Sequence, residues 1–248
     1  MHVPKTGGTT VQRYLTYCIG GKKMGRRQKL GEILLDRPPS DSDIERARVS
    51  RFICGHFSWA SIERMGRSDS DYVFTFLREP KSRLHSFYRF MTNYPDDHLS
   101  KSVRSRVERC RGMSQLDMYT TDDIDIRNMV DNYMVRQLSG RLTTYPIAEW
   151  EWPVLLETAK RNLESLNYVG FQETYGTDFV QIMRDLQMPR VEPVPRENAT
   201  VGGPLGAWKQ SDIQPESAAA VMTAMAPLVR WDEMLYEHAL ALREARAA

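Results

Sequence analysis

The sequence is poor in cysteine, has no long apolar run and carries almost no net charge. Its three cysteines, Cys18, Cys54 and Cys110, form no CxxC pair and no Cys/His cluster, so neither a disulfide framework nor a structural zinc site is indicated. The longest charge-free, mostly apolar run, Ser217–Val229, is well short of the ~20 residues that span a bilayer. With 34 Lys and Arg against 32 Asp and Glu, the net charge of +2 argues against binding nucleic acid by bulk charge.

What is present describes one globular domain. The 248 residues, 41% hydrophobic and 27% charged, show no repeat, low-complexity tract or linker, so we expect a single domain over residues 1–248. No charged segment followed by an apolar one opens the sequence, so no signal peptide is visible. We therefore expect a cytoplasmic protein with reduced thiols and no membrane or nucleic-acid partner, although a trimmed luminal domain would look the same. The oligomeric state is left open.

Hydrophobic periodicity predicts an α/β domain. Short aromatic and β-branched segments at 51–55, 71–77 and 168–171 are typical of strands, and residues 1–3 resemble the stub of another. Helical spacing and helix-ending signals predict helices at 9–17, 80–94, 122–139, 153–166 and, as one or two helices, 215–247. The apolar residues of the 80–94 helix, Phe90 among them, are expected to pack in the core. Because strands alternate with helices, the sheet should be largely parallel.

The most informative stretch is HVPKTGGTT, His2–Thr10. Gly7 and Gly8 allow the backbone to curl so that N–H groups converge, and the helix that follows adds its partially positive N-terminus. Lys5 contributes a full charge. Three threonines contribute hydroxyl donors: Thr6, Thr9 and Thr10. These groups are typical of a phosphate or similar oxyanion site, although the glycines alone would fit an ordinary strand-to-helix turn. Because Lys5 precedes the glycines, the stretch is not the GxxxxGK[ST] loop of nucleotide kinases.

A second stretch, FLREPKSRLHSFYRF, places Arg78 at the carboxyl end of a predicted strand and Ser86 in the helix that follows. Ligands of open α/β sheets bind at the carboxyl ends of strands, so Arg78 is expected to face the same crevice as Lys5. Arginine suits bidentate phosphate binding. Taken alone, Arg78 would be a salt-bridge partner and Ser86 an ordinary helix residue.

Together the two stretches resemble the two cofactor signatures of sulfotransferases that use 3′-phosphoadenosine 5′-phosphosulfate (PAPS). The resemblance is to the carbohydrate O-sulfotransferase branch that includes the uronyl 2-O-sulfotransferases. Weaker similarities follow in order at Gly55–Phe57, Asn132–Gly140, Val169–Glu173 and Asp232–Tyr236. The resemblance implies a three-layer α/β domain with a central, mostly parallel sheet, related to the P-loop nucleotide hydrolases.

The resemblance also implies roles for individual residues. The 5′-phosphosulfate would bind the turn formed by Lys5, Thr6, Gly7, Gly8, Thr9 and Thr10. Lys5 would stabilise charge on the leaving oxygen, and Arg78 and Ser86 would hold the 3′-phosphate. His56 would be the base that takes a proton from the acceptor hydroxyl, and no metal is required. His56 could instead be a loop histidine or a structural partner, and His2 is the rival base.

The acceptor follows from the resemblance alone: a hydroxyl on a carbohydrate or polysaccharide. Glu63 and the basic run at 22–27 are candidate acceptor contacts, and residues 196–200 are candidates to close over the nucleotide. A small-molecule or protein-tyrosine sulfotransferase, or a non-catalytic module that binds the product 3′-phosphoadenosine 5′-phosphate (PAP), remains an alternative. An ATP-dependent kinase is disfavoured by the position of Lys5. Only three residues precede Pro4, where the family has a full strand, so we expect a short strand or a truncated start.

Overall fold

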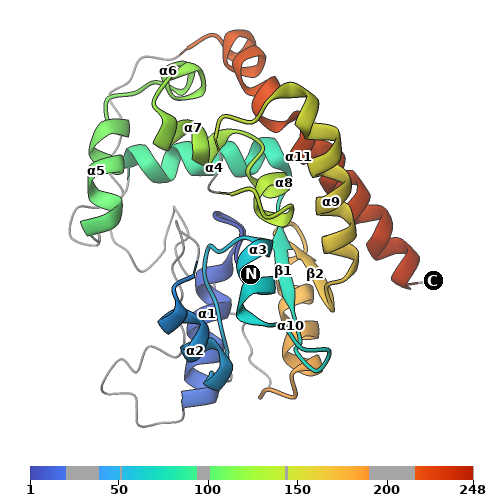
Figure 1. Ribbon diagram of the computed structural model, residues 1–248. Coiled ribbons are helices and arrows are strands. Elements are labelled where there is room, and N and C mark those ends of the chain that lie inside the picture. The colour runs from blue at the N-terminus through green and yellow to red at the C-terminus, as the bar shows by residue number, and fades with distance from the viewer. Residues whose placement is uncertain (21–38, 51, 94–100, 143–144, 190–215, 248) are drawn as a thin grey trace.

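A computed structural model describes residues 1–20, 39–50, 52–93, 101–142, 145–189 and 216–247, and Figure 1 shows their arrangement. The helices are α1 (Gly8–Gly20), α2 (Asp41–Val49), α3 (Trp59–Met65), α4 (Pro80–Asn93), α5 (Lys101–Cys110), α6 (Gln115–Thr120), α7 (Ile124–Val130), α8 (Tyr133–Leu138), α9 (Trp152–Glu164), α10 (Tyr175–Asp185) and α11 (Ala218–Ala247), with a 3-10 turn at Glu149–Glu151. The strands are β1 (Phe74–Leu77) and β2 (Tyr168–Phe171).

The two strands form a small parallel sheet. Phe74 lies opposite Tyr168 and Leu77 opposite Phe171. The expected α/β class is confirmed in this coarse form: among the described residues the sheet has two strands and the helices are many. The segment expected as a strand at 51–55 contributes an isolated bridge at Cys54. Residues 1–3 form no strand, although the His2 N–H donates to the Gly55 carbonyl at 2.9 Å.

Each face of the sheet packs against its own set of helices. Phe76 of β1 packs with apolar side chains of α1 and α10. On the other face, Leu77 and Phe171 pack with α8, α9 and the second half of α11, which runs alongside α9 in Figure 1. Gly170 leaves room for the Phe76 ring, since a Cβ there would lie 2.7 Å from it. Burial of each large apolar side chain contributes about 1.5–3 kcal/mol, so the carboxyl end of β1 is fixed from both sides.

The helix expected over 122–139 is two helices, α7 and α8, that meet at Asn132. Asn132 has a left-handed backbone, with φ of 41°. Its N–H and side-chain amide donate to the Leu228 and Pro227 carbonyls at 2.7 and 2.9 Å. Its Oδ1 accepts from the Trp231 and Asp232 N–H groups at 2.8 and 3.2 Å. Pro227 lies inside α11, where a proline disrupts the helical bonding pattern. Asn132 therefore supplies hydrogen bonds to the turn of α11 that follows Pro227. The left-handed backbone that this requires ends α7 before α8 begins.

The long terminal helix, α11, contains 30 residues and spans from one core cluster to another. No helix in the described ranges is long and apolar enough to cross a membrane. The three cysteines are free thiols, with Cys54 and Cys110 buried.

Candidate functional site

The turn before α1 has a constrained backbone. Lys5 and Gly7 are both left-handed, with φ of 71° and 89°. Thr6 is fully buried and its hydroxyl donates to the Val3 carbonyl at 2.8 Å, so this hydroxyl proton is used within the turn. The N–H of Thr10, which is also buried, donates to the Gly7 carbonyl at 3.1 Å. A left-handed non-glycine residue costs of order 1–3 kcal/mol and is typical of functional sites. The fold thus holds Lys5 in a strained conformation at the start of α1.

Both glycines of the turn are required, for different reasons. Gly7 has the left-handed backbone that favours glycine, and a Cβ there would lie 2.7 Å from the Tyr175 ring of α10. Gly8 has no such backbone, but a Cβ there would overlap the His2 ring. The turn is therefore pressed between α10 and His2.

Two cations meet at this turn. The Arg78 guanidinium donates to the Lys5 carbonyl at 3.3 Å, and the Lys5 Nζ lies 4.2 Å from the centre of the Phe90 ring on α4. Burial, and then the nearby Arg78, lower the pKa of Lys5 to about 8. Burial also lowers the pKa of Arg78, against the opposing effect of Glu173 and Glu79. The charged neighbour that shifts Lys5 is thus another cation, and an anion bound between the two would stabilise both charges. Phe90 packs against the core cluster of α4 as expected, and its ring also contacts Lys5.

Arg78 and Ser86 are placed by the junction of β1 and α4. Arg78 follows the last residue of β1, and α4 begins two residues later. The Glu79 carboxylate caps α4 by accepting from two N–H groups of its first turn at 2.7 and 2.9 Å. Glu173, which follows β2, accepts from the Glu79 N–H at 3.0 Å. Ser86 is half-buried farther along α4. The two glutamates therefore fix the backbone from which Arg78 extends.

The rings of His56 and His2 are in contact at a tilt of 32°. Their ring centres are 4.3 Å apart, and His56 Nδ1 lies 3.0 Å from the His2 carbonyl oxygen. A carbonyl only accepts, so Nδ1 carries the proton and Nε2 of the neutral ring is the basic nitrogen. Burial lowers the pKa of His2 well below its usual range, and His56, the terminal amine and Lys5 act in the same direction. His2 is therefore neutral at pH 7, and its ring packs against Gly8.

Gln137 belongs to the same cluster. It lies within the Asn132–Gly140 stretch that resembles the family, but no role was predicted for it. It is fully buried on α8, and its Nε2 donates to the carbonyls of His2 and Phe57 at 3.0 and 2.9 Å. The only sign in the sequence is an amide side chain within the apolar segment YMVRQL, and this pattern alone does not identify the groups to which the amide donates.

Other predicted contacts lie elsewhere or outside the description. The basic run at 22–27 and residues 196–200 lie outside the described residues, as does the Thr9 side chain. Glu63 accepts a hydrogen bond from Trp59 Nε1 at 2.9 Å within α3, which is a structural contact. No group of three His, Cys, Asp or Glu side chains that could hold a metal lies in the described ranges.

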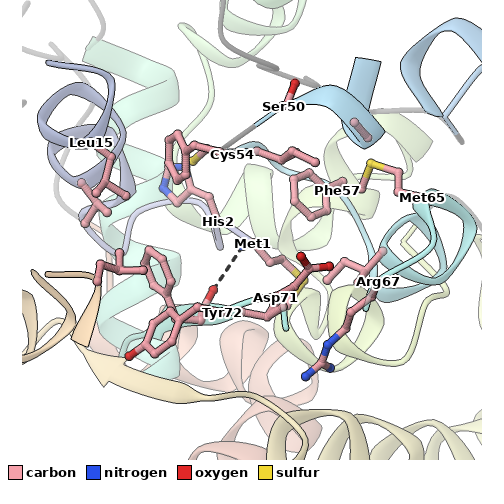
Figure 2. A pocket seen from close by; sticks show the side chains of 18 of the residues that line it. Met1, His2, Leu15, Ser50, Cys54, Phe57, Met65, Arg67, Asp71 and Tyr72 are labelled. Carbon is pink, nitrogen blue, oxygen red and sulfur yellow. Dashed lines mark hydrogen bonds between the residues drawn. The ribbon is translucent and has the colours of Figure 1, made fainter. Parts of the chain in front are cut away.

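A cavity of about 550 Å³ lies beside the turn (Figure 2). Most of its lining is apolar, including Leu15, Phe57 and Met65, with Arg67 and Asp71 among the polar members. Where the dashed line is drawn, the Met1 amine donates to the Phe74 carbonyl at 3.1 Å. Of the turn, the cavity is lined by His2 and Gly8 and not by Lys5, and neither Arg78 nor Ser86 lines it. This cavity is therefore adjacent to the cationic site but separate from it.

Comparison with known protein families identifies the family of the chain that carries this cationic turn. A family model described as the sulfotransferase family matches residues 1–202, which include the turn, His56, Arg78 and Ser86. The chain belongs to the sulfotransferase family. It is therefore a transferase of sulfuryl groups, and enzymes of this family generally use PAPS. A search among curated proteins gives no significant match.

Proposed function

We propose that the protein transfers the sulfuryl group of PAPS to a hydroxyl of a carbohydrate or polysaccharide. The observation that carries the proposal is the meeting of Lys5 and Arg78 at the N-terminus of α1. Burial disfavours both charges there, Arg78 further disfavours that of Lys5, and within the described part of the chain no carboxylate is paired with Lys5. A ligand with several negative charges supplies what this site lacks.

PAPS has two anionic ends, and the residues present fit both. The turn at Lys5–Thr10 would bind the 5′-phosphosulfate through backbone N–H groups and the ammonium. Arg78 and Ser86, on a separate element, would hold the 3′-phosphate. The parallel pairing of β1 with β2 and the helices on both faces of the sheet support a three-layer fold related to the P-loop hydrolases.

The chemistry requires a base and a stabiliser for the leaving oxygen. When bound, PAPS supplies a sulfuryl group on a bisphosphate leaving group. His56 Nε2 would take the proton of the acceptor hydroxyl as its oxygen bonds to sulfur. Lys5 would stabilise the phosphate oxygen that keeps the electron pair of the broken oxygen–sulfur bond. His2, with its strongly lowered pKa, would support the turn and not act as the base.

A thermal-shift titration with PAP, ATP and ADP tests the cofactor site without an acceptor. PAP at ~100 times its dissociation constant should add about 2.7 kcal/mol of stability. We expect a larger shift with PAP than with ATP or ADP, its loss in Arg78→Ala, and its retention in Arg161→Ala, an exposed arginine on α9. A folded protein that does not respond to PAP would contradict the proposal.

The acceptor is tested by transfer of ³⁵S from labelled PAPS to polysaccharides, to phenols and to tyrosine peptides. We expect label in the polysaccharides and its loss in His56→Ala. Label found only in phenols or peptides would show that the acceptor is not a carbohydrate, while the proposed cofactor site would still stand. PAP binding without transfer to any acceptor would favour a non-catalytic module.

A further inference from the structure

Gln137 makes two side-chain bonds at the heart of the site. Its Nε2 donates to the His2 and Phe57 carbonyls at 3.0 and 2.9 Å. The amide orientation is determined by these partners, because the flipped amide would point its oxygen at two carbonyl oxygens. Its Oε1 is buried and has no hydrogen-bond partner among the described residues.

Both carbonyls held by Gln137 bear on His56. The His2 carbonyl accepts from His56 Nδ1 at 3.0 Å, and Phe57 is the residue that follows His56. On the preceding side, the Gly55 carbonyl accepts from the His2 N–H at 2.9 Å. The backbone around His56 and the atom that holds its ring are thus tied into one network, and Gln137 supplies its side-chain donors.

The helix that carries Gln137 is itself firmly placed. The Asp232 carboxylate accepts from the Met134 and Val135 N–H groups at 3.1 and 2.8 Å. The unpartnered Oε1 costs about 1–3 kcal/mol, which offsets what the two donated bonds contribute, so Gln137 adds little net stability. The two donated bonds point to a role in the site.

We propose that Gln137 is a positioning residue for His56: by holding the His2 carbonyl, it keeps the proton on His56 Nδ1 and leaves Nε2 to accept the proton of the substrate. The inference rests on the proposed function for its catalytic meaning, but the tautomer of His56 is a property of the protein alone. Without Gln137, the His2 carbonyl loses one of its two donors and is free to move. The His56 ring then exchanges between tautomers, and the one protonated at Nε2 cannot accept.

Nitrogen NMR of ¹⁵N-histidine-labelled protein tests the proposal without acceptor or cofactor. The His56 signals are identified by their loss in His56→Ala. We expect the Nδ1–H tautomer in the wild type and a roughly fivefold lower tautomer ratio in Gln137→Met, because the net worth of one hydrogen bond is about 1 kcal/mol. Gln137→Leu serves as a second variant if Gln137→Met does not fold.

The matched control is Asn162→Leu. Asn162, on α9, donates from Nδ2 to the Leu138 carbonyl of α8 at 2.8 Å, and no hydrogen bond joins it to His2 among the described residues. This variant loosens α8 without touching the network, so the His56 tautomer should not change. A folded Gln137→Met or Gln137→Leu protein with the wild-type tautomer ratio, or an equal change in Asn162→Leu, would overturn the proposal.

A kinetic arm links the tautomer to catalysis. Gln137→Met should lower kcat by a factor no larger than the fall in the tautomer ratio, with PAP affinity unchanged, and should cause no further loss in a His56→Ala background, because both changes act through one group. An equal loss in both backgrounds would mean a merely structural role and would also overturn the proposal. Failure of the wild type to bind PAP would refute the proposed function while the NMR result still stands.

Discussion

Two helices of this protein begin in similar ways and end up with opposite electrostatics. A left-handed residue precedes each, Gly7 before α1 and Asn132 before α8. At α8 the first N–H groups are bonded by the carboxylate of Asp232, which belongs to α11. At α1 the nearby charges are Lys5 and Arg78. A helix N-terminus attracts an anion in either case.

The difference is who supplies the anion. At α8 the protein supplies it, and the fully buried guanidinium of Arg83 lies 4.0 Å from Asp232. Burial raises the pKa of Asp232 to about 6, against the opposing effect of Arg83 and the two N–H groups. At α1, burial and Arg78 lower the pKa of Lys5 to about 8. We call the N-terminus of α8 the closed end, because Asp232 of α11 bonds it and lies beside Arg83 of α4. We call the N-terminus of α1 the open end, because its anion would be a ligand. The comparison predicts that charge removal damages stability at the first end and function at the second.

Asp232→Ala should have the largest effect. It removes the acceptor for two N–H groups of α8 and leaves the Arg83 guanidinium buried without an opposite charge. Breaking a buried pair in this way costs about 3–5 kcal/mol, which urea unfolding would measure. The double variant Arg83→Met, Asp232→Asn removes both charges and should recover part of the loss. If Asp232→Ala unfolds at the wild-type urea concentration, the closed end does not stabilise the fold.

Lys5→Met is the corresponding change at the open end. Loss of the ammonium should lower the rate of sulfuryl transfer by about 10²–10³-fold, the effect of removing one group that stabilises developing charge. Stability should stay the same or rise, because a desolvated cation beside Arg78 is removed. Transfer of ³⁵S and urea unfolding on the same preparation measure the two effects. If Lys5→Met loses as much stability as Asp232→Ala, the charges at the N-termini of α1 and α8 do not differ in their effect on stability, and the comparison is wrong.

Gly8→Ala should have a smaller effect that begins with packing. The new methyl group would overlap the His2 ring, so His2 must move and its ring contact with His56 is lost. We expect a stability loss of about 1–3 kcal/mol, measured by urea unfolding, together with weaker PAP binding. Gly176→Ala is the matched control, because it lies in α10 with nothing within 4 Å of the added Cβ. It should stabilise the protein by about 0.5–1 kcal/mol. Equal effects of the two changes would show that the close approach of His2 is not required.

The elements predicted from sequence are those with strong local signals. The strand at 168–171 has the predicted bounds, and the helices at 80–94 and 153–166 begin and end within two residues of α4 and α9. The break between α7 and α8 was not predictable in this way. Asn132 is bonded to carbonyls and N–H groups of α11 nearly a hundred residues away, and no local pattern reports such a contact. The helices α2, α3, α5, α6 and α10 were not predicted either; several are short.

In the candidate site too, the residues with local sequence signals were predicted and those defined by distant contacts were not. The turn and Arg78 were identified because their residues form short contiguous motifs, and the structure brings Arg78 to the Lys5 carbonyl. Phe90 was assigned to the core because an aromatic residue at helical spacing usually lies there, and it does pack against the core. Its additional contact with Lys5 was not predictable from spacing. Gln137 was missed because its partner is His2, 135 residues earlier in the chain. A buried amide becomes informative only once its acceptors are known.

The smallest predicted effect is the pH dependence of PAP binding, and it sharpens the comparison most directly. In the free protein the pKa of Lys5 is about 8, and a bound anion should raise it. Binding therefore takes up a proton when the pH exceeds about 8, and affinity falls as the pH rises, by at most tenfold per unit. The phosphates of PAP, with a second pKa near ~6, are fully ionised in this range and Arg78 stays charged, so neither adds to the slope. Calorimetry from pH 7.5 to 9.5, in buffers of different ionisation enthalpy, measures both the affinity and the proton uptake. Lys5→Met should bind PAP more weakly, and its affinity should not depend on pH. If the affinity of this variant still falls with pH as steeply as that of the wild type, the proton is taken up by another group and Lys5 is not the cation that titrates at the N-terminus of α1.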